Sequence, residues 1–170
     1  AGIDAGDAGS PPPVGYEGTF PAGEGVLAAV LTVAGLERDV ELYVPAGVAA
    51  SPPLLIALHG TYGNGLDMVG PDRPNGFEDV ADSAGVILAA PFARQLVAGD
   101  WDQHGDGEMD RSYWETLPRD DPSRGADPAR NPDLLLVRAI IEEAVRAYGV
   151  DRRRVYVAGH SNGAFFALNV

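Results

Sequence analysis

The chain has 170 residues, of which 45% are hydrophobic, and this length favours one domain with a proper core over two large ones. Its formal net charge of −13 repels nucleic-acid phosphates and anionic membranes, which argues against both as partners. It has no cysteine and no lysine, which excludes disulfides, thiol catalysis, Schiff-base chemistry, a serine–lysine dyad and a P-loop lysine from these residues.

The first 22 residues are rich in Gly, Ala, Pro and Asp and include the triplet Pro11-Pro12-Pro13. Such a stretch buries too little apolar surface to order itself, so residues 1–22 are predicted to be a flexible tether and residues 23–170 the folded domain. A tether at the start of a chain without an initiator Met fits a secreted, periplasmic or cell-surface protein whose signal peptide has been removed, and it would equally fit an expression remnant. No apolar run reaches the length of a membrane-spanning helix.

Three runs predict the first strands. Gly25–Ala34 and Arg38–Val44 are β-rich and are separated by Gly35, which predicts an antiparallel pair. Pro53–Leu58 is a continuous apolar run, typical of a strand buried on both faces of a parallel sheet. A glycine-rich loop, His59–Gly65, follows that strand.

Helices and strands then alternate. Residues 77–84 predict a helix, 86–90 a strand and 155–158 a last strand. Asn131-Pro132-Asp133 supplies an N-cap, a first-turn proline and an acid against the helix dipole, so it begins a helix that runs to Tyr148. The predicted buried stripe of that helix is Leu134, Val137, Ile141, Ala144, Val145 and Tyr148. The alternation predicts an α/β fold with a doubly wound, mostly parallel sheet and an N-terminal antiparallel strand pair.

The pentapeptide Gly159–Gly163 has the form Gly-x-Ser-x-Gly between an apolar strand and an apolar helical start. At a sharp strand-to-helix turn the middle residue takes a strained backbone conformation, and side chains at the glycine positions would collide with the neighbouring strand and helix. The turn would expose the Ser161 oxygen near a helix N-terminus that favours negative charge. Ser161 is therefore predicted to be the catalytic nucleophile; the alternative is a plain glycine-rich turn with a satisfied serine.

The turn His59-Gly60-Thr61 comes directly after the first buried parallel strand. A turn at that place can aim a backbone N–H at a developing oxyanion, opposite the N–H of the residue after the nucleophile. The predicted donors are Thr61 and Asn162, with Tyr62 as the near alternative to Thr61. The competing interpretation is an ordinary strand-end loop.

Several segments resemble the polyhydroxybutyrate depolymerase and feruloyl-esterase-like branch of the α/β-hydrolase superfamily. They are "RDVELYVPAG", "PPLLIALHGTYGNG", "NPDLLLVRAIIEEAVRAYGV" and "VDRRRVYVAGHSNGAFFAL". The resemblance covers residues 25–170, and its specific part is "GHSNG" with its flanks. It implies a secreted serine esterase without a cofactor, acting as a polyester depolymerase or a feruloyl- or acetyl-type esterase. A peptidase or amidase on the same fold, and a non-catalytic binding or assembly subunit, are the alternatives.

Residues 100–133 form an acidic segment interleaved with aromatic residues. Trp101, Tyr113 and Trp114, together with Tyr62, would either line a substrate wall or pack the loop onto the domain. The loop at 100–110 has the oxygen density of a calcium site but lacks EF-hand spacing, so a solvated acidic loop is favoured and no metal is predicted.

The expected partners of Ser161 are missing from these residues. In this fold the triad acid and histidine follow the serine, and His59, His104 and His160 are poor substitutes for the base. The last strand would also have an unpaired apolar edge, and the helix after Ser161 would have too little to pack against. We therefore expect a C-terminal part of the fold, on a second polypeptide or a further stretch of sequence, to supply the Asp and His.

Overall fold

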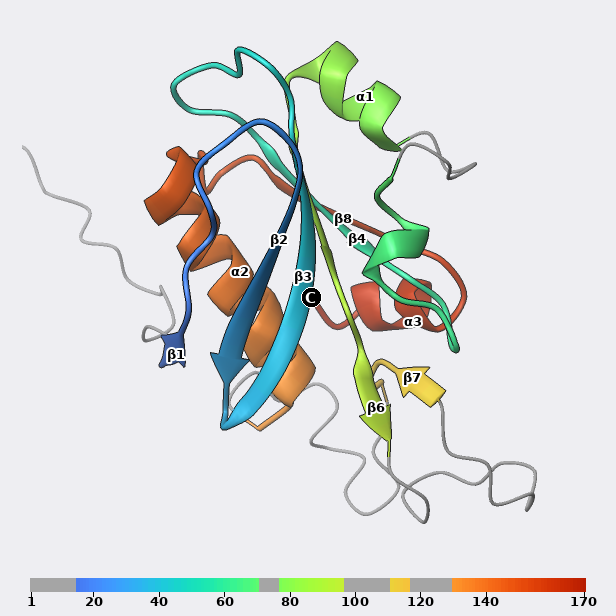
Figure 1. The fold of residues 1–170 in the computed structure, drawn as a ribbon. Helices are drawn as coiled ribbons and strands as arrows, with labels where there is room; N and C mark the ends of the chain where they lie inside the picture. Colours follow the sequence, from blue (N-terminus) through green and yellow to red (C-terminus); the bar gives the residue numbers. More distant parts are fainter. Residues whose placement is uncertain (1–14, 71–76, 97–110, 117–129) are drawn as a thin grey trace, which may run out of the picture.

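The computed structural model describes residues 15–70, 77–96, 111–116 and 130–170. The strands are β1 (Tyr16–Glu17), β2 (Gly25–Val33), β3 (Leu36–Val44), β4 (Leu54–Leu58), β5 (Ile87–Pro91), β6 (Arg94–Leu96), β7 (Arg111–Tyr113) and β8 (Val155–Gly159). The helices are the 3-10 turn η1 (Gly65–Asp67), α1 (Phe77–Ala84), α2 (Pro132–Tyr148) and α3 (Asn162–Ala167). Figure 1 shows how they are arranged.

Six of these strands form one sheet in the order β1-β2-β3-β5-β4-β8, and β6 pairs with β7 separately. Pairing is antiparallel from β1 through β3 to β5 and parallel between β5, β4 and β8. The prediction of a mostly parallel sheet is therefore wrong for the described residues, where the sheet is mixed. The difference arises because β3 pairs with β5, Val40 opposite Pro91, so that β1 to β3 extend the parallel strands from one side.

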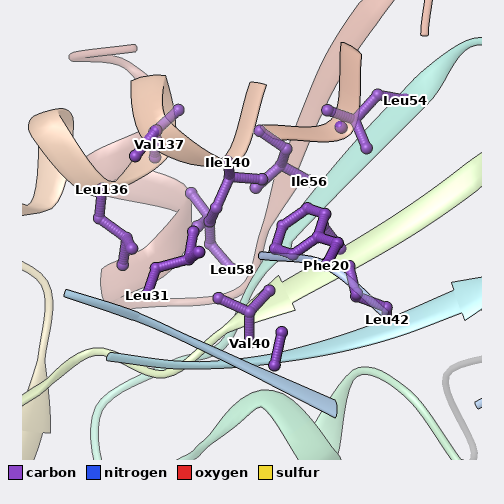
Figure 2. Close-up of a cluster of buried hydrophobic side chains, with 14 of the residues drawn as sticks. Phe20, Leu31, Val40, Leu42, Leu54, Ile56, Leu58, Leu136, Val137 and Ile140 are labelled. Carbon is purple, nitrogen blue, oxygen red and sulfur yellow. The ribbon is translucent and has the colours of Figure 1, made fainter. Parts of the chain in front are cut away.

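Both faces of the central strands are covered, which explains their continuous apolar sequences. On β4, Leu54, Ile56 and Leu58 point into a core shared with α2, whereas Ala57 points into a smaller core with α1. Figure 2 shows side chains of α2, including Ile140, meeting those of the strands. The two helices therefore lie on opposite faces of the sheet, and the carboxyl ends of β4 and β8 stay uncovered by either.

Helix α2 has the termini that its sequence predicts. The Asn131 side chain accepts hydrogen bonds from the N–H groups of Asp133 and Leu134, and Gly149 ends the helix with a φ of 71°. Its buried face is wider than the predicted stripe, because Leu136, Ile140 and two acids, Asp133 and Glu143, are buried as well. The predicted members Ile141, Val145 and Tyr148 are only half-buried.

The predicted tether is too long at its C-terminal end. Tyr16 pairs with Val33 through β1 and β2, and Phe20 is buried in the core beside α2. The carboxylate of Glu143 accepts hydrogen bonds from the Phe20 N–H (2.7 Å) and the Tyr16 hydroxyl (2.9 Å). Residues 16–20 are therefore part of the domain, and residues 1–14 lie outside the described residues.

Candidate active site

Ser161 occupies the sharp turn between β8 and α3. Its backbone has φ 51° and ψ −119°, and its side chain is exposed. The turn is held by hydrogen bonds from the N–H of His160 to the Leu58 carbonyl (3.0 Å) and from the N–H of Phe165 to the Ser161 carbonyl (3.1 Å). A non-glycine residue at such a φ is strained, and the surrounding contacts keep it there.

The glycines on either side of Ser161 are required by close packing. A Cβ on Gly159 would lie 2.6 Å from the nitrogen of Ala164, and a Cβ on Gly163 would lie 2.8 Å from the carbonyl carbon of Leu58. Both distances are shorter than real Cβ atoms show, and the obstructing atoms are backbone. The helix therefore turns back against the strands in the way that the sequence pattern predicts.

The turn after β4 lies directly against the serine turn. Leu58 of β4 is in register with Gly159 of β8, so the carboxyl ends of the two parallel strands are neighbours. A Cβ on Gly60 would lie 3.2 Å from the Cβ of Ser161. The two turns predicted to carry hydrogen-bond donors are thus adjacent in space.

Some backbone N–H groups of these two turns already donate a hydrogen bond within the protein, and others do not. Within the described residues, the N–H groups of Thr61 and Asn162 have no acceptor. The N–H of Tyr62 donates to the carbonyl of Ser112 (3.2 Å). Of the two alternatives on the first turn, Thr61 therefore has the N–H that remains available to a ligand.

A cavity of about 620 Å³ opens at this place. Ser161 and His160 line it from the serine turn, and Met68 and Phe77 add apolar surface. The remaining lining residues are His59, Gly60, Thr61, Tyr62, Gly63, Asp67, Ala158 and Gly159. The cavity has the size range of small-molecule sites and combines apolar walls with a few polar groups.

His59 has a structural role, which agrees with the expectation that it is a poor substitute for the base. Its side chain is buried, Nε2 accepts a hydrogen bond from the Ala93 N–H (2.9 Å), and Nδ1 lies 2.7 Å from the Gly60 carbonyl. Since the Ala93 N–H can only donate, the ring proton lies on Nδ1 and both ring nitrogens are engaged. Burial lowers the pKa of the imidazole, although the hydrogen bond to Gly60 opposes this. His59 is therefore unsuited to take a proton from Ser161.

The four residues predicted as a substrate wall have different positions. Tyr62 is 60% exposed and lines the cavity, with a φ of 68°. Trp114 is 0% exposed, so it packs its segment onto the domain and the wall prediction is wrong at this residue. Tyr113 is half-buried, with its hydroxyl 3.0 Å from Oγ1 of Thr116, and it does not line the cavity. Trp101 lies outside the described residues.

The acidic loop at 100–110, considered above for calcium, also lies outside the described residues. Among the residues that are described, no three His, Asp or Glu side chains gather as a metal site would require.

A buried polar cluster around Arg38 and Asp133 was not predicted from the sequence. Arg38 lies 2.8 Å from Asp133 as a buried ion pair and donates to the Phe92 carbonyl. The other oxygen of Asp133 accepts from the Glu115 N–H (2.7 Å), and Glu115 pairs with Arg94. No local pattern signals this cluster, because its members come from four separate segments.

No protein-family model matches the chain. Putative esterase NocK from Nocardia uniformis subsp. tsuyamanensis is 30% identical over 146 residues, which are 84% of this chain and 36% of that protein. The bifunctional acetylxylan esterase/xylanase XynS20E of Neocallimastix patriciarum is 27% identical over 135 residues, 79% of this chain and 16% of that protein. The solved acetyl xylan esterase from Aspergillus awamori superposes with a TM-score of 0.55 at 17% identity, covering 89% of this chain and 44% of that one.

The chain has an α/β-hydrolase-type fold, and the proteins to which it is similar are named esterases. It spans about a third of the length of the first of these relatives and less of the second. Within this α/β-hydrolase fold, the carboxyl ends of β4 and β8 are the edge at which the cavity opens. In the part of the chain that is described, no helix is both long enough and apolar enough to span a bilayer.

Proposed function

We propose that the protein is a serine carboxylic-ester hydrolase in which Ser161 is the nucleophile. The observation that carries the proposal is the strained turn of Ser161, with φ 51°, an exposed side chain and a place in the cavity wall. Close packing allows only glycine at positions 159 and 163, and the strained Ser161 between them makes no side-chain cap hydrogen bond to α3. This arrangement suits a hydroxyl that has to reach a substrate.

In the proposed reaction the Ser161 Oγ attacks the ester carbonyl carbon, and its proton passes to a general base. The carbonyl oxygen becomes an oxyanion that accepts hydrogen bonds from the N–H groups of Thr61 and Asn162. The intermediate collapses when the protonated base gives its proton to the leaving ester oxygen, which departs as the alcohol, and an acyl-enzyme remains. Water then attacks this ester by the same route, which releases the carboxylic acid and restores Ser161. No step requires a metal or an organic cofactor.

We propose that the base and its orienting acid come from outside the described residues, on a further stretch of the protein or on a second polypeptide. His59 is unsuited to the role, since both its ring nitrogens are engaged. The same partner would cover exposed apolar residues on β8, on α3 and directly after α3, where Tyr156 is 54%, Phe165 68% and Leu168 84% exposed. Intact-mass measurement of the native protein under denaturing and non-denaturing conditions tests whether a second polypeptide is present.

For the substrate we propose acetyl-type or similarly short acyl esters ahead of polyesters and feruloyl esters. Two similar proteins carry acetylxylan esterase in their names. Acetyl groups of this kind are borne by polymers that do not cross membranes, so we also propose that the protein acts outside the cytoplasm. Initial rates on acetylated xylan, methyl ferulate and a hydroxybutyrate oligomer rank the three classes.

Removing the hydroxyl oxygen of Ser161 tests whether this residue is the nucleophile. Ser161→Ala should abolish hydrolysis of 4-nitrophenyl acetate and labelling by a fluorophosphonate, with activity reduced by about 10³-fold or more. Ser83→Ala is the matched control, because Ser83 is an exposed serine on α1 whose hydroxyl donates to the Val80 carbonyl and does not line the cavity. It should retain both properties.

Labelling of another residue in the native protein, or unchanged hydrolysis by Ser161→Ala, would contradict the proposal. Faster cleavage of 4-nitroanilide amides than of the matching esters would reassign the site to an amidase or peptidase. Absence of both activities and of labelling in the native protein would leave a binding or assembly role.

A further inference from the structure

Residues 112–116, here named the bridging segment, contact the turn after β4. The carbonyl of Ser112 accepts the Tyr62 N–H (3.2 Å), and the Ser112 hydroxyl donates to the carbonyl of Gly63. The indole N–H of Trp114 donates to the carbonyl of His59 (2.9 Å). The bridging segment therefore holds this turn two residues before Thr61, at His59, and directly after it, at Tyr62.

The same segment also holds the serine turn. The backbone N–H of Trp114 donates to the side-chain oxygen of Asn162 (2.7 Å), and the Asn162 amide donates back to the Trp114 carbonyl (3.3 Å). The indole ring stacks on Phe166 of α3, with ring centroids 5.4 Å apart and planes 13° from parallel. Trp114, Asn162 and Phe166 are all buried. One tryptophan is thus bonded to both turns at once.

We propose that Trp114 and the side chain of Asn162 are positioning residues that set the relative placement of the Thr61 and Asn162 N–H groups. The inference rests on the proposed function. An oxyanion site needs two donors aimed at one point, and here they lie on turns that follow different strands. Holding the Asn162 side chain orients the N–H of the same residue, and holding the His59 carbonyl places the backbone two residues before Thr61.

The competing interpretation is that Trp114 only fills the core. The two interpretations differ in what a mild substitution changes. Loss of packing alone lowers stability and leaves the chemistry of the folded protein as it was. Loss of positioning lowers kcat while the KM is kept, because the N–H groups stabilise charge that is present only in the transition state.

Trp114→Phe separates these effects in the native protein, because it deletes the indole N–H and keeps an aromatic ring against Phe166. With 4-nitrophenyl acetate, kcat should fall about ten-fold while the KM changes by less than about two-fold. Binding of a trifluoromethyl ketone, which forms a tetrahedral adduct with a serine, should weaken by a similar factor. Ile140→Val, a buried substitution on α2 without a hydrogen bond to either turn, is the control and should keep kcat.

Asn162→Ala removes the contact between Trp114 and the serine turn from the side of the serine turn. It keeps the backbone N–H of residue 162, which is proposed to donate to the oxyanion. It should lower kcat by more than Trp114→Phe does, because it removes both hydrogen bonds to Trp114. Each variant is first checked for cooperative unfolding, and either one that folds tests the inference.

Three outcomes are distinguishable. A lower kcat with an unchanged KM in a folded variant supports positioning. Unchanged kcat in folded Trp114→Phe or Asn162→Ala, in a native protein that hydrolyses esters through Ser161, overturns the inference and leaves the proposed function standing. A native protein that neither hydrolyses esters nor labels at Ser161 overturns the proposed function, and the inference fails with it.

Discussion

Three residues other than glycine have a positive φ in the described chain: Ala34, Tyr62 and Ser161. Tyr62 and Ser161 lie in the cavity wall, where a strained backbone places a side chain or an N–H group for use. Ala34 lies far from the cavity in sequence and topology, at the turn between β2 and β3. The strain at Ala34 is therefore unrelated to the cavity and comes from the tight turn of the β2–β3 hairpin.

Ala34→Asn should stabilise the protein. Ala34 and Gly35 have φ values of 53° and 76° between the paired residues Val33 and Leu36, which is the backbone of a type I′ turn. Asparagine tolerates this conformation better than alanine, so the free energy of unfolding should rise by about 0.5–1 kcal/mol. Urea denaturation measures the change.

The control for this substitution is Ala46→Asn. Ala46 is also exposed and also precedes a glycine in a turn, but it is not among the residues with positive φ. Its replacement should leave the unfolding midpoint unchanged. An equal gain at both positions would mean that the asparagine acts through something other than backbone strain.

At the scale of elements, α2 anchors the N-terminal segment through one buried acid. Glu143 accepts hydrogen bonds from Tyr16 and from the Phe20 N–H and pairs with Arg146. Burial alone would raise the pKa of Glu143, but these partners together lower it. Burial and the hydrogen bond to Glu143 raise the pKa of Tyr16 to about 12.

Tyr16 should make stability depend on pH in alkaline solution. Its pKa is near 10 when unfolded and about 12 when folded. Its contribution is therefore complete below pH 10 and is lost as the pH rises from 10 through 12, because only the unfolded chain releases the proton. Tyr16→Phe should lower the free energy of unfolding by about 1–2 kcal/mol at pH 7 and flatten this alkaline decline.

The exposed Tyr156 of β8 provides the comparison, since Tyr156→Phe removes a hydroxyl without a buried partner. Urea unfolding at pH 7, 10 and 11.5 measures all three proteins. The same alkaline slope in Tyr16→Phe as in the native protein would show that the segment is not held by this hydrogen bond.

At the scale of the whole molecule, the buried Arg38–Asp133 pair joins the sheet to α2. Arg38 extends from β3, contacts the Phe92 carbonyl after β5, and meets Asp133 in the first turn of the helix. Burial lowers the pKa of Arg38, and Asp133 opposes this by favouring the charged form. A charge buried this way is stable only with its partner.

Arg38→Met should destabilise the protein by about 3–5 kcal/mol, because it leaves the Asp133 carboxylate buried without a counter-charge. Arg38→Met combined with Asp133→Asn should recover a large part of this loss. Arg153→Met is the control, since Arg153 is 89% exposed and loss of its solvent-screened pair with Asp151 should leave the free energy of unfolding nearly unchanged. Additive losses in the double variant, measured by urea unfolding, would contradict a direct coupling.

Parts of the fold and the site were predictable because their signals are local. The apolar run that becomes β4 and the Asn131 cap with Gly149 that bound α2 are properties of neighbouring residues. The glycines around Ser161 belong to the same class, since both the pattern and the close contacts arise within one strand-to-helix turn. These pieces predict an α/β fold, the resemblance of their segments points to the α/β-hydrolase superfamily, and the comparisons confirm that fold.

Other features depend on residues that meet only in the folded chain. Trp114 and Asn162 are 48 positions apart, and Tyr16 and Glu143 are 127 apart, so neither pair leaves a mark in the local sequence. In the local sequence, Trp114 in its acidic segment and Glu143 on its helix both resemble surface residues. Their burial depends on which partner the rest of the fold brings to them.

The sequence by itself determined strands β2, β3, β4, β5 and β8, the ends of α2 and the serine turn, because apolar periodicity, caps and glycines act over a few residues. Only the tertiary structure decided that the sheet is mixed, that residues 16–20 join the domain, and that Trp114 connects the two turns instead of lining the cavity. These depend on pairing and on hydrogen bonds between distant segments, whose energies no local pattern encodes.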